Sequence, residues 1–497
     1  MSKRTESPGL GSLASAALTA VSTLVVTGFA AVVGVVIARE FGRTEETDGF
    51  FAAYGVFIVI VLASQAIRLA VLPPLAIARR EGRLSGELVG FALALAVAAL
   101  PLLVLGEAAA EPLADLLTGS GSATAQDVCA EALRWLVPAG IAYLFAGLAA
   151  SGLAAHDDYA TAAVGYALGG TAALIEILTR VDADGIAALY RGVALNGAIA
   201  LAVPVVGLAW RAVRAGVPRH ALRRDSSSLR SRLGVFATAA ALPIALQLLY
   251  VVCLPFAGRV EPGAVTSFGY AYLAAASFVS ITAFSIGLVS SVPLTRAGLD
   301  ARAAERHVTA ATWVALTVIG AAVGAFVVAG GDIVESLLGD AYGGDIGEEV
   351  SRIVVVLAPW MVASVGVNVS FPLAFVAGRQ RLLPVIGAGA LAVQIVLAWI
   401  GSELLELDGL AVALTLSTVL VLAALLAQLG ALVTGLRGIV RAAAVIAAVA
   451  VVAFVPANLV LGTLSAAFAG VLLYGVIVAV WRPRGLTQSW GYLRALR

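Results

Sequence analysis

This sequence has few charged residues and very few of the side chains that bind metals. Of its 497 residues 12% are charged and 61% are hydrophobic, with three histidines and two cysteines. A typical soluble domain is about one-quarter charged, so a soluble globular protein is excluded. Cys129 and Cys253 are too few for a disulfide-rich or zinc-binding scaffold. We expect two unpaired thiols that pack in the interior, with a single bridge between them as the alternative.

Catalytic and cofactor motifs are also missing. The sequence contains no P-loop, no HExxH and no nucleophile elbow, and its few histidines and cysteines form no metal-ligand pattern. No segment between apolar runs exceeds about thirty residues, which is too short for an independently folding catalytic domain. We therefore expect no enzyme, no catalytic residue, no metal, no cofactor and no nucleic-acid partner. The function is expected inside the membrane.

Long apolar runs fill the rest of the chain. A spanning helix needs about 20 apolar residues, and on that rule the sequence predicts an all-α polytopic membrane protein with about fourteen spans. The first run is longer than the roughly 7–15 apolar residues of a signal peptide, so we interpret it as a retained span. The predicted spans are 14–38, 50–78, 87–106, 131–155, 159–179, 185–210, 232–254, 265–295, 307–330, 351–377, 382–402, 409–433, 439–459 and 461–481.

The positions of arginine predict the orientation of the spans. Arginines and the single lysine concentrate on alternate connecting segments, and acidic residues concentrate on the others. Basic residues stay on the cytoplasmic side, so both termini are expected to be cytoplasmic. The exception is the predicted inner turn His156-Asp157-Asp158, which contains no arginine.

The chain contains a degenerate internal repeat. The segment from Ile37 to Glu81 resembles the segment from Gly258 to Arg302, with matching Gly-Arg, Phe, Tyr and Pro positions. Six predicted spans separate the two copies, so the halves have the same orientation, as in a parallel repeat. We therefore predict two six-helix lobes. The predicted parts are 1–210 for the first lobe, 211–231 for a basic cytoplasmic linker, 232–436 for the second lobe, and 437–497 for two extra spans and a tail.

Polar residues inside the predicted spans are the candidate site residues, because they are costly there. Arg68 is about ten residues, or roughly 15 Å, from the inner basic cluster. It either extends to the inner interface or binds an anionic head group in a cavity. The other candidates for substrate binding are uncharged, and bonds between helices are their alternative role. They are Gln65, Asn196, Gln247, Asn368 and Gln394.

A basic inner rim and several prolines add to this interpretation. Arg79, Arg80, Arg83 and Arg296 could gather an anionic substrate, although the general bias of arginine toward the cytoplasm already accounts for them. Prolines within spans remove backbone hydrogen bonds and kink helices, which suits a transporter whose lobes rock. These prolines are Pro101, Pro138, Pro204, Pro243, Pro359 and Pro372.

Several motifs along the chain resemble one family. They are IAREFG, TDGFFAAY, SQA and LPPLA in the first hairpin, then LADLLTGSGSATAQDVCAEALRWLVP, GLAASGLAAHDDYATAAVGYAL and FPLAFVAGRQRLLPVIGAGAL. Together they resemble the MurJ branch of the MOP superfamily, which also contains MATE exporters and Wzx-type flippases. The resemblance implies two six-helix lobes around a central cavity, two extra helices that form a lipid-facing groove, and transport of lipid II across the membrane.

The sequence departs from that family at its cavity arginines. MurJ proteins typically place arginines within the first span, early in the second, and after the YAD-type motif of the eighth. Here the corresponding segments read VVTGFAAVVGVVIA, AAYGVFIVIVLA and GYAYLAAA. Arg68 is the remaining candidate for pairing with a pyrophosphate.

The leading hypothesis is a flippase for a lipid-linked sugar such as lipid II, which would cross by alternating access. The alternatives are a polysaccharide or MATE-type small-molecule exporter, and a transport-inactive scaffold of the cell-wall machinery. An exporter would need a buried acid, for which Glu176 is a poor candidate. The sequence does not specify a coupling ion.

Overall fold

The computed structural model describes residues 32–119, 121–214, 228–284 and 301–495, and these residues form helices and turns without a strand. They contain 12 helices that are long and apolar enough to cross a membrane. The prediction of an all-α polytopic membrane protein is therefore confirmed. Most of the first predicted span, residues 14–31, lies outside the described residues, and residues 32–41 are helical.

One of these helices contains two of the predicted spans. Helix α14 (Leu383–Gln428) has 46 residues, and a straight helix of that length would extend about 69 Å, over twice the roughly 30 Å of a hydrocarbon core. At Glu406 the backbone leaves the helical region, with φ 51° and ψ −127°. The chain turns there, so the predicted spans 382–402 and 409–433 are the two arms of a hairpin.

Proline ends a helix where one long span is predicted. The predicted span 351–377 is divided into α12 (Asp345–Val356) and α13 (Ala358–Val376), with Pro359 in the first turn of α13. Proline has no N–H to donate but fits the first turn of a helix. Pro101, Pro138, Pro204 and Pro372 lie inside continuous helices.

The chain forms two compact units. Unit 1 comprises residues up to 41, 45–117 and 121–247, and unit 2 comprises 42–44, 118–120 and 248–497. The division falls within α8 (Leu229–Ala257). The predicted lobe and linker boundaries at 210, 231 and 436 stay a prediction.

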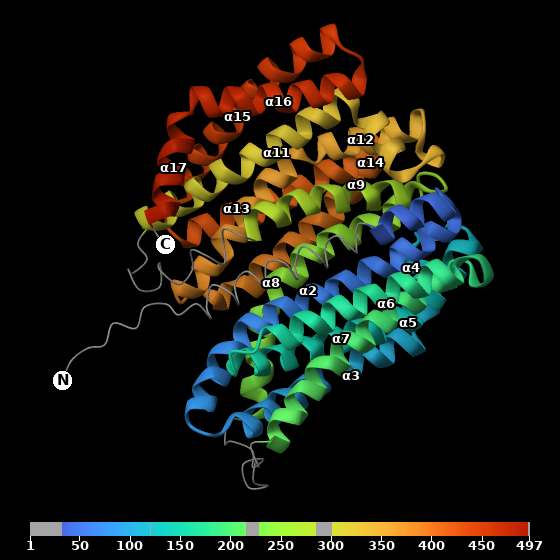
Figure 1. Cartoon of the computed structure of the whole chain (residues 1–497), viewed down its shortest axis with the longest axis vertical. Coiled ribbons are helices and arrows are strands. Elements are labelled where there is room, and N and C mark those ends of the chain that lie inside the picture. The colour runs from blue at the N-terminus through green and yellow to red at the C-terminus, as the bar shows by residue number, and fades with distance from the viewer. Residues whose placement is uncertain (1–31, 120, 215–227, 285–300, 496–497) are drawn as a thin grey trace, which may run out of the picture. The chain divides into compact units, whose positions relative to one another are not determined.

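Unit 1 is built around helix α5, whose neighbours α2, α3, α4, α6 and α7 are labelled in Figure 1. Its helices, besides the first part of α8, are α2 (Glu45–Arg80), α3 (Leu84–Ala108), α4 (Ala110–Leu117), α5 (Ala123–Ala155), α6 (Ala160–Asp184) and α7 (Ala187–Arg214). Helix α5 contacts each of the others from α2 to α7, and 72% of its most apolar window is buried, against 28% for α3. Its last ten residues, AGLAASGLAA, are mostly small, which lets neighbouring helices approach closely.

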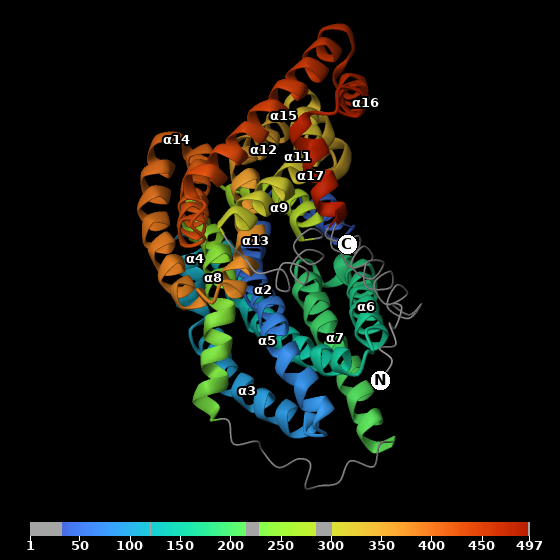
Figure 2. The ribbon, with the colours of Figure 1, turned by 90° about the vertical axis from the view of Figure 1, so that its left-hand side faces the viewer.

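Unit 2 is organised around the long helix α11. Its helices, besides the second part of α8, α12, α13 and α14, are α9 (Ala264–Val279), η2 (Ser280–Phe284), α11 (Ala301–Leu338), η3 (Asp340–Tyr342), η4 (Gln380–Leu382), α15 (Leu432–Val460), α16 (Thr463–Trp481) and α17 (Arg484–Ala495). Helices α15, α16 and α17 all pack on α11 (Figure 2). The Phe454 ring of α15 lies between Gly324 of α11 and Gly470 of α16, where an added Cβ would come within 2.3 Å of the ring.

Candidate functional site

Arg68 is partly buried on α2, with its side chain held against α5 and α6. It crosses α5 at Gly147, where an added Cβ would lie 3.2 Å from the Arg68 Cγ and 2.3 Å from the Ser64 Oγ. The Ser64 hydroxyl donates to the backbone carbonyl of Tyr143 at 2.8 Å, which fixes the crossing. The Arg68 guanidinium is close enough to Tyr166 of α6 to act on its hydroxyl electrostatically.

No carboxylate of the described residues forms an ion pair with Arg68, although other arginines of unit 1 have such partners. A guanidinium deep inside a membrane-spanning helix is energetically costly without a counter-charge. It offers up to five N–H donors in a planar fork that matches a phosphate. Arg68 is therefore a candidate binding position for an anionic group.

Aromatic rings and one amide connect Arg68 to Asn196 of α7. The Tyr143 ring stacks on Tyr166 with the centroids 6.0 Å apart, and Phe57 contacts Tyr143 edge-on at 5.8 Å. The Asn196 side chain interacts with the Tyr143 hydroxyl, and its Oδ1 is buried without a hydrogen-bond partner in the described structure. A cation, hydroxyls and a free amide acceptor thus lie together in unit 1. We call Arg68, Tyr143, Tyr166 and Asn196 the Arg68 cluster.

The other predicted site residues do not join this cluster. Gln65 is exposed on α2, and Gln247 is buried at the end of unit 1. In unit 2, the exposed Asn368 donates from Nδ2 to the Ser364 carbonyl of its own helix at 2.8 Å. Gln394 is fully buried and donates from Nε2 to the Cys253 Sγ at 3.2 Å.

The two cysteines are buried free thiols, so the expected packing role is confirmed. Cys129 lies on α5 in unit 1 and Cys253 on α8 in unit 2.

The predicted inner rim divides into different environments. Arg79 donates to the Asp157 carboxylate at 2.7 Å and to the backbone carbonyl of Ala155. Arg83 pairs with Glu81 on the same turn, and Arg80 is exposed. Arg296 lies outside the described residues.

The turn at residues 156–158, which contains no arginine, forms ion pairs with arginines of two neighbouring helices. Arg79 of α2 pairs with Asp157, and Arg211 of α7 pairs with Asp158 at 2.6 Å. Burial alone would raise the pKa of Asp158, but hydrogen bonds from Thr161 and Arg211 outweigh it and hold that pKa below its ordinary value. Burial lowers the pKa of His156, and the charges of Arg79 and Arg211 lower it further.

The depressed pKa of His156 predicts a loss of stability in mild acid. The folded turn favours protonated His156 less than the unfolded chain does. The contribution of His156 to the free energy of unfolding is therefore complete at pH values above its ordinary pKa of 6.5. The contribution falls as the pH drops through 6.5 toward the folded value. We expect the melting temperature of the purified protein to decrease between about pH 7.5 and about pH 5. His156→Gln should reduce this decrease, and an unchanged slope in that variant would contradict the assignment.

Unit 1 also contains a buried ion pair that the sequence did not predict. Glu87 of α3 and Arg232 of α8 are joined at 2.7 Å, with side chains 11% and 5% exposed. The Arg232 guanidinium lies 5.4 Å from the centre of the Phe91 ring, and Phe91 contacts Phe236 at 5.7 Å. One signal was available in the sequence, because Glu87 and Arg232 are each followed four residues later by phenylalanine.

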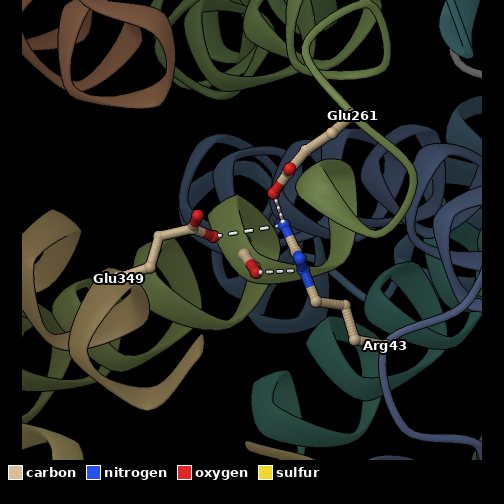
Figure 3. Close-up of polar contacts among 4 residues, drawn as sticks. Arg43, Glu261 and Glu349 are labelled. Atoms are coloured by element: carbon tan, nitrogen blue, oxygen red, sulfur yellow. Dashed lines mark hydrogen bonds and ion pairs between the residues drawn. The ribbon is translucent and has the colours of Figure 1, made fainter. Parts of the chain in front are cut away.

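A second charged cluster lies in unit 2 (Figure 3). Arg43 donates from Nε to the Ser267 Oγ at 3.0 Å and pairs through Nη2 with Glu261 and, at 3.3 Å, with Glu349. Gly263, which has φ +84°, passes so close that an added Cβ would meet the Arg43 side chain. The repeat contains the matching Arg259, whose Nε donates to the Gly119 carbonyl at 3.4 Å. Both arginines of the repeat therefore hold short connecting segments in unit 2.

Comparison with known proteins places the fold. The sequence matches no known family and no curated protein. The structure is similar to that of "Lipid II flippase MurJ, inward closed conformation", with TM-score 0.71, 14% identity, and coverage of 93% of this chain and 98% of that one. It is also similar to an inward-facing multidrug resistance MATE family transporter of the MOP superfamily, with TM-score 0.61, 16% identity, and coverage of 83% and 98%. For the eukaryotic MATE transporter AtDTX14 the TM-score is 0.53, with 16% identity and coverage of 87% and 97%. The chain therefore has the fold of the MOP-superfamily membrane transporters.

Proposed function

We propose that this protein is a flippase that moves a polyprenyl-(pyro)phosphate-linked cell-wall precursor, similar to lipid II, from the inner to the outer leaflet by alternating access. It would act in the bacterial cytoplasmic membrane, with both termini cytoplasmic. The observation that supports the proposal most directly is Arg68, a partly buried cation without an acidic partner among the described residues.

The Arg68 cluster has the groups that such a head group would need. The Arg68 fork can donate two hydrogen bonds to phosphate oxygens. The buried Oδ1 of Asn196 can accept a hydrogen bond from a sugar hydroxyl or an amide. Tyr143 and Tyr166 add ring faces with a hydroxyl at the edge. The apolar polyprenyl chain would stay in the lipid hydrocarbon throughout, so no free energy of desolvation would oppose its movement between leaflets.

A MATE-type exporter is the second candidate, because two of the similar structures are MATE transporters. Such coupling would use a buried acid, and the buried acids among the described residues of unit 1 are Asp48, in the first turn of α2, and Glu87. The amino end of α2 already stabilises the negative charge of Asp48. However, Glu87 is already paired with Arg232 at 2.7 Å, so protonation would leave a buried arginine without its counter-charge. The flippase is therefore the better-supported proposal.

Substitution of Arg68 tests the proposal. We expect Arg68→Ala to lower head-group transport in proteoliposomes at least tenfold, because a charge-assisted hydrogen bond contributes roughly 1.5–3 kcal/mol. Arg68→Lys should keep part of the activity, since it retains the charge but loses the fork. Arg180→Ala, which removes an exposed arginine of α6, is the matched control. Native mass spectrometry of each variant should show a bound polyprenyl-phosphate sugar that is lost with Arg68→Ala alone.

Two results would contradict the proposal. Transport that is unchanged in Arg68→Ala would remove the anion site. Absence of transport in the unsubstituted protein, together with a copurified bulk phospholipid only, would favour the transport-inactive scaffold.

A further inference from the structure

The chain ends with a short helix that the position of α16 places at a membrane surface. Helix α16 has 19 residues, or about 28 Å at 1.5 Å per residue, which spans the roughly 30 Å hydrocarbon core once. Arg482 then adopts a left-handed conformation with φ 45°, which turns the chain. Helix α17 begins at Arg484, so its 12 residues lie beside the end of a span.

One face of α17 packs on the first turns of α11 (Figure 2). An added Cβ at Gly485 would lie 2.4 Å from the Trp313 ring, and Tyr492 contacts the buried His307 with ring centres 6.1 Å apart. The Ser489 side chain between them is also buried. Residues 485, 489 and 492 have helical spacing, so they form the face toward α11.

The opposite side of α17 is exposed and contains a tryptophan and arginines. Trp490 is 55% exposed, and Arg484 and Arg494 are exposed beside it. Tryptophan is enriched at membrane–water interfaces, where its ring sits at the level of the head groups. This side therefore suits contact with a lipid surface.

Neighbouring helix ends extend the positive charge. Arg306 of α11 acts electrostatically on Tyr492, and Gly438 of α15 packs against Thr309 of α11. These contacts bring the basic ends of α11 and α15 to the level of α17. We call the exposed arginines of this region the α17 basic surface: Arg302, Arg306, Arg437, Arg441, Arg482, Arg484 and Arg494. Within the described ranges 301–310, 432–441 and 482–494, Glu305 is the one acidic residue.

We propose that the α17 basic surface binds the phosphate groups of anionic phospholipids of the surrounding bilayer and thereby holds α17 against α11. Seven arginines against one glutamate give the surface a charge opposite to that of the lipid. A basic residue near an anionic leaflet strengthens binding about fivefold. The site is separate from the Arg68 cluster, which belongs to unit 1. The inference therefore stands or falls independently of the flippase proposal.

A label on α17 tests the inference in the full chain. Both native cysteines are buried, and Cys129→Ala with Cys253→Ser removes them. In this cysteine-free protein, Gly491→Cys introduces one thiol at an exposed position of α17. An environment-sensitive fluorophore is then attached to that thiol. The labelled protein is placed in nanodiscs of phosphatidylcholine with increasing phosphatidylglycerol. We expect a saturable emission shift as phosphatidylglycerol increases. Arg484→Gln with Arg494→Gln should raise the midpoint about 25-fold if the two effects multiply.

A control pair of substitutions shows whether the response depends on the arginines of the α17 basic surface or on the number of arginines in general. Arg379→Gln with Arg381→Gln removes two exposed arginines from the turn between α13 and α14, and it should leave the midpoint unchanged. Added salt should weaken the response of the protein with all its arginines, since it screens exposed charges. If the emission did not change with phosphatidylglycerol, the inference would be overturned. It would also be overturned if the two pairs of substitutions shifted the midpoint equally. A response to a polyprenyl phosphate in place of phosphatidylglycerol would assign the surface to substrate and overturn it also.

Discussion

Glu87→Ala is expected to lower the free energy of unfolding of unit 1 by about 3–5 kcal/mol, because it removes the carboxylate that is paired with the buried charge of Arg232. The Arg232 side chain is 5% exposed, so water cannot replace the lost carboxylate. The Phe91 ring over the guanidinium compensates only in part, because a cation–π contact contributes roughly 0.5–2 kcal/mol. Reversible unfolding in mixed micelles would measure the change.

Two further variants show whether the missing partner is the cause. Replacing both residues, as Glu87→Leu with Arg232→Met, should be much less harmful than Glu87→Ala alone, since apolar replacements of a buried pair are often neutral or stabilising. Glu111→Ala removes a carboxylate that is 82% exposed from its pair with Arg134, and we expect a loss below about 1 kcal/mol. Similar losses for Glu87→Ala and Glu111→Ala would refute the buried-pair explanation.

Gly409→Ala is expected to destabilise the α14 hairpin by about 1–3 kcal/mol, as overpacking does in a close-packed core. An added Cβ at Gly409 would lie 1.9 Å from the backbone oxygen of Gly401, and one at Gly401 would lie 2.5 Å from that of Gly409. Both contacts are with backbone atoms, so no side chain can rotate away to make room. The two arms would have to separate, and Gly409→Val should separate them further.

A glycine of the same helix provides the control. Gly389 has no heavy atom within 4 Å of an added Cβ, so Gly389→Ala should be neutral or stabilise by up to about 1 kcal/mol through helix propensity. Thermal unfolding of the three variants in one detergent would rank them. If Gly389→Ala were as destabilising as Gly409→Ala, the effect would come from losing any glycine and not from the backbone contact.

The hydropathy of the chain was sufficient to predict the spans and the fold class. The break within α14 was predictable because Glu403, Glu406 and Asp408 interrupt an otherwise apolar stretch. Helix α17 was not predicted, because its 12 residues are too few and too polar for a spanning segment. The division at Pro359 was missed because the apolar stretch continues through it.

The polar contacts were much harder to predict than the helices. Glu87 and Arg232 are 145 residues apart, and Arg43 and Glu261 are 218 apart. Such pairs follow from how helices pack and not from any local pattern. Arg68 and Asn196 were chosen individually because they are polar residues inside predicted spans, but the tyrosines that connect them were not singled out.

The similar structures show why fold and site separate so clearly in this chain. An identity of 14% is enough for a TM-score of 0.71, because apolar residues can replace one another without moving a span. Arginine has no such substitute when it binds a phosphate. The absence of arginine from the first and eighth predicted spans and from the early part of the second therefore bears on the substrate and leaves the architecture unchanged.

The position of Phe454 has a consequence for motion. Its ring leaves no room for sliding between α11 and α16, because the glycines that face it have no side chain to yield. The Tyr474 hydroxyl of α16 also donates to the Thr317 carbonyl of α11 at 2.9 Å, which fixes the vertical register of those two helices. Helices α11, α15 and α16 should therefore travel as one rigid body in any transport cycle, so that the last two spans are carried by α11 and do not form an independent gate.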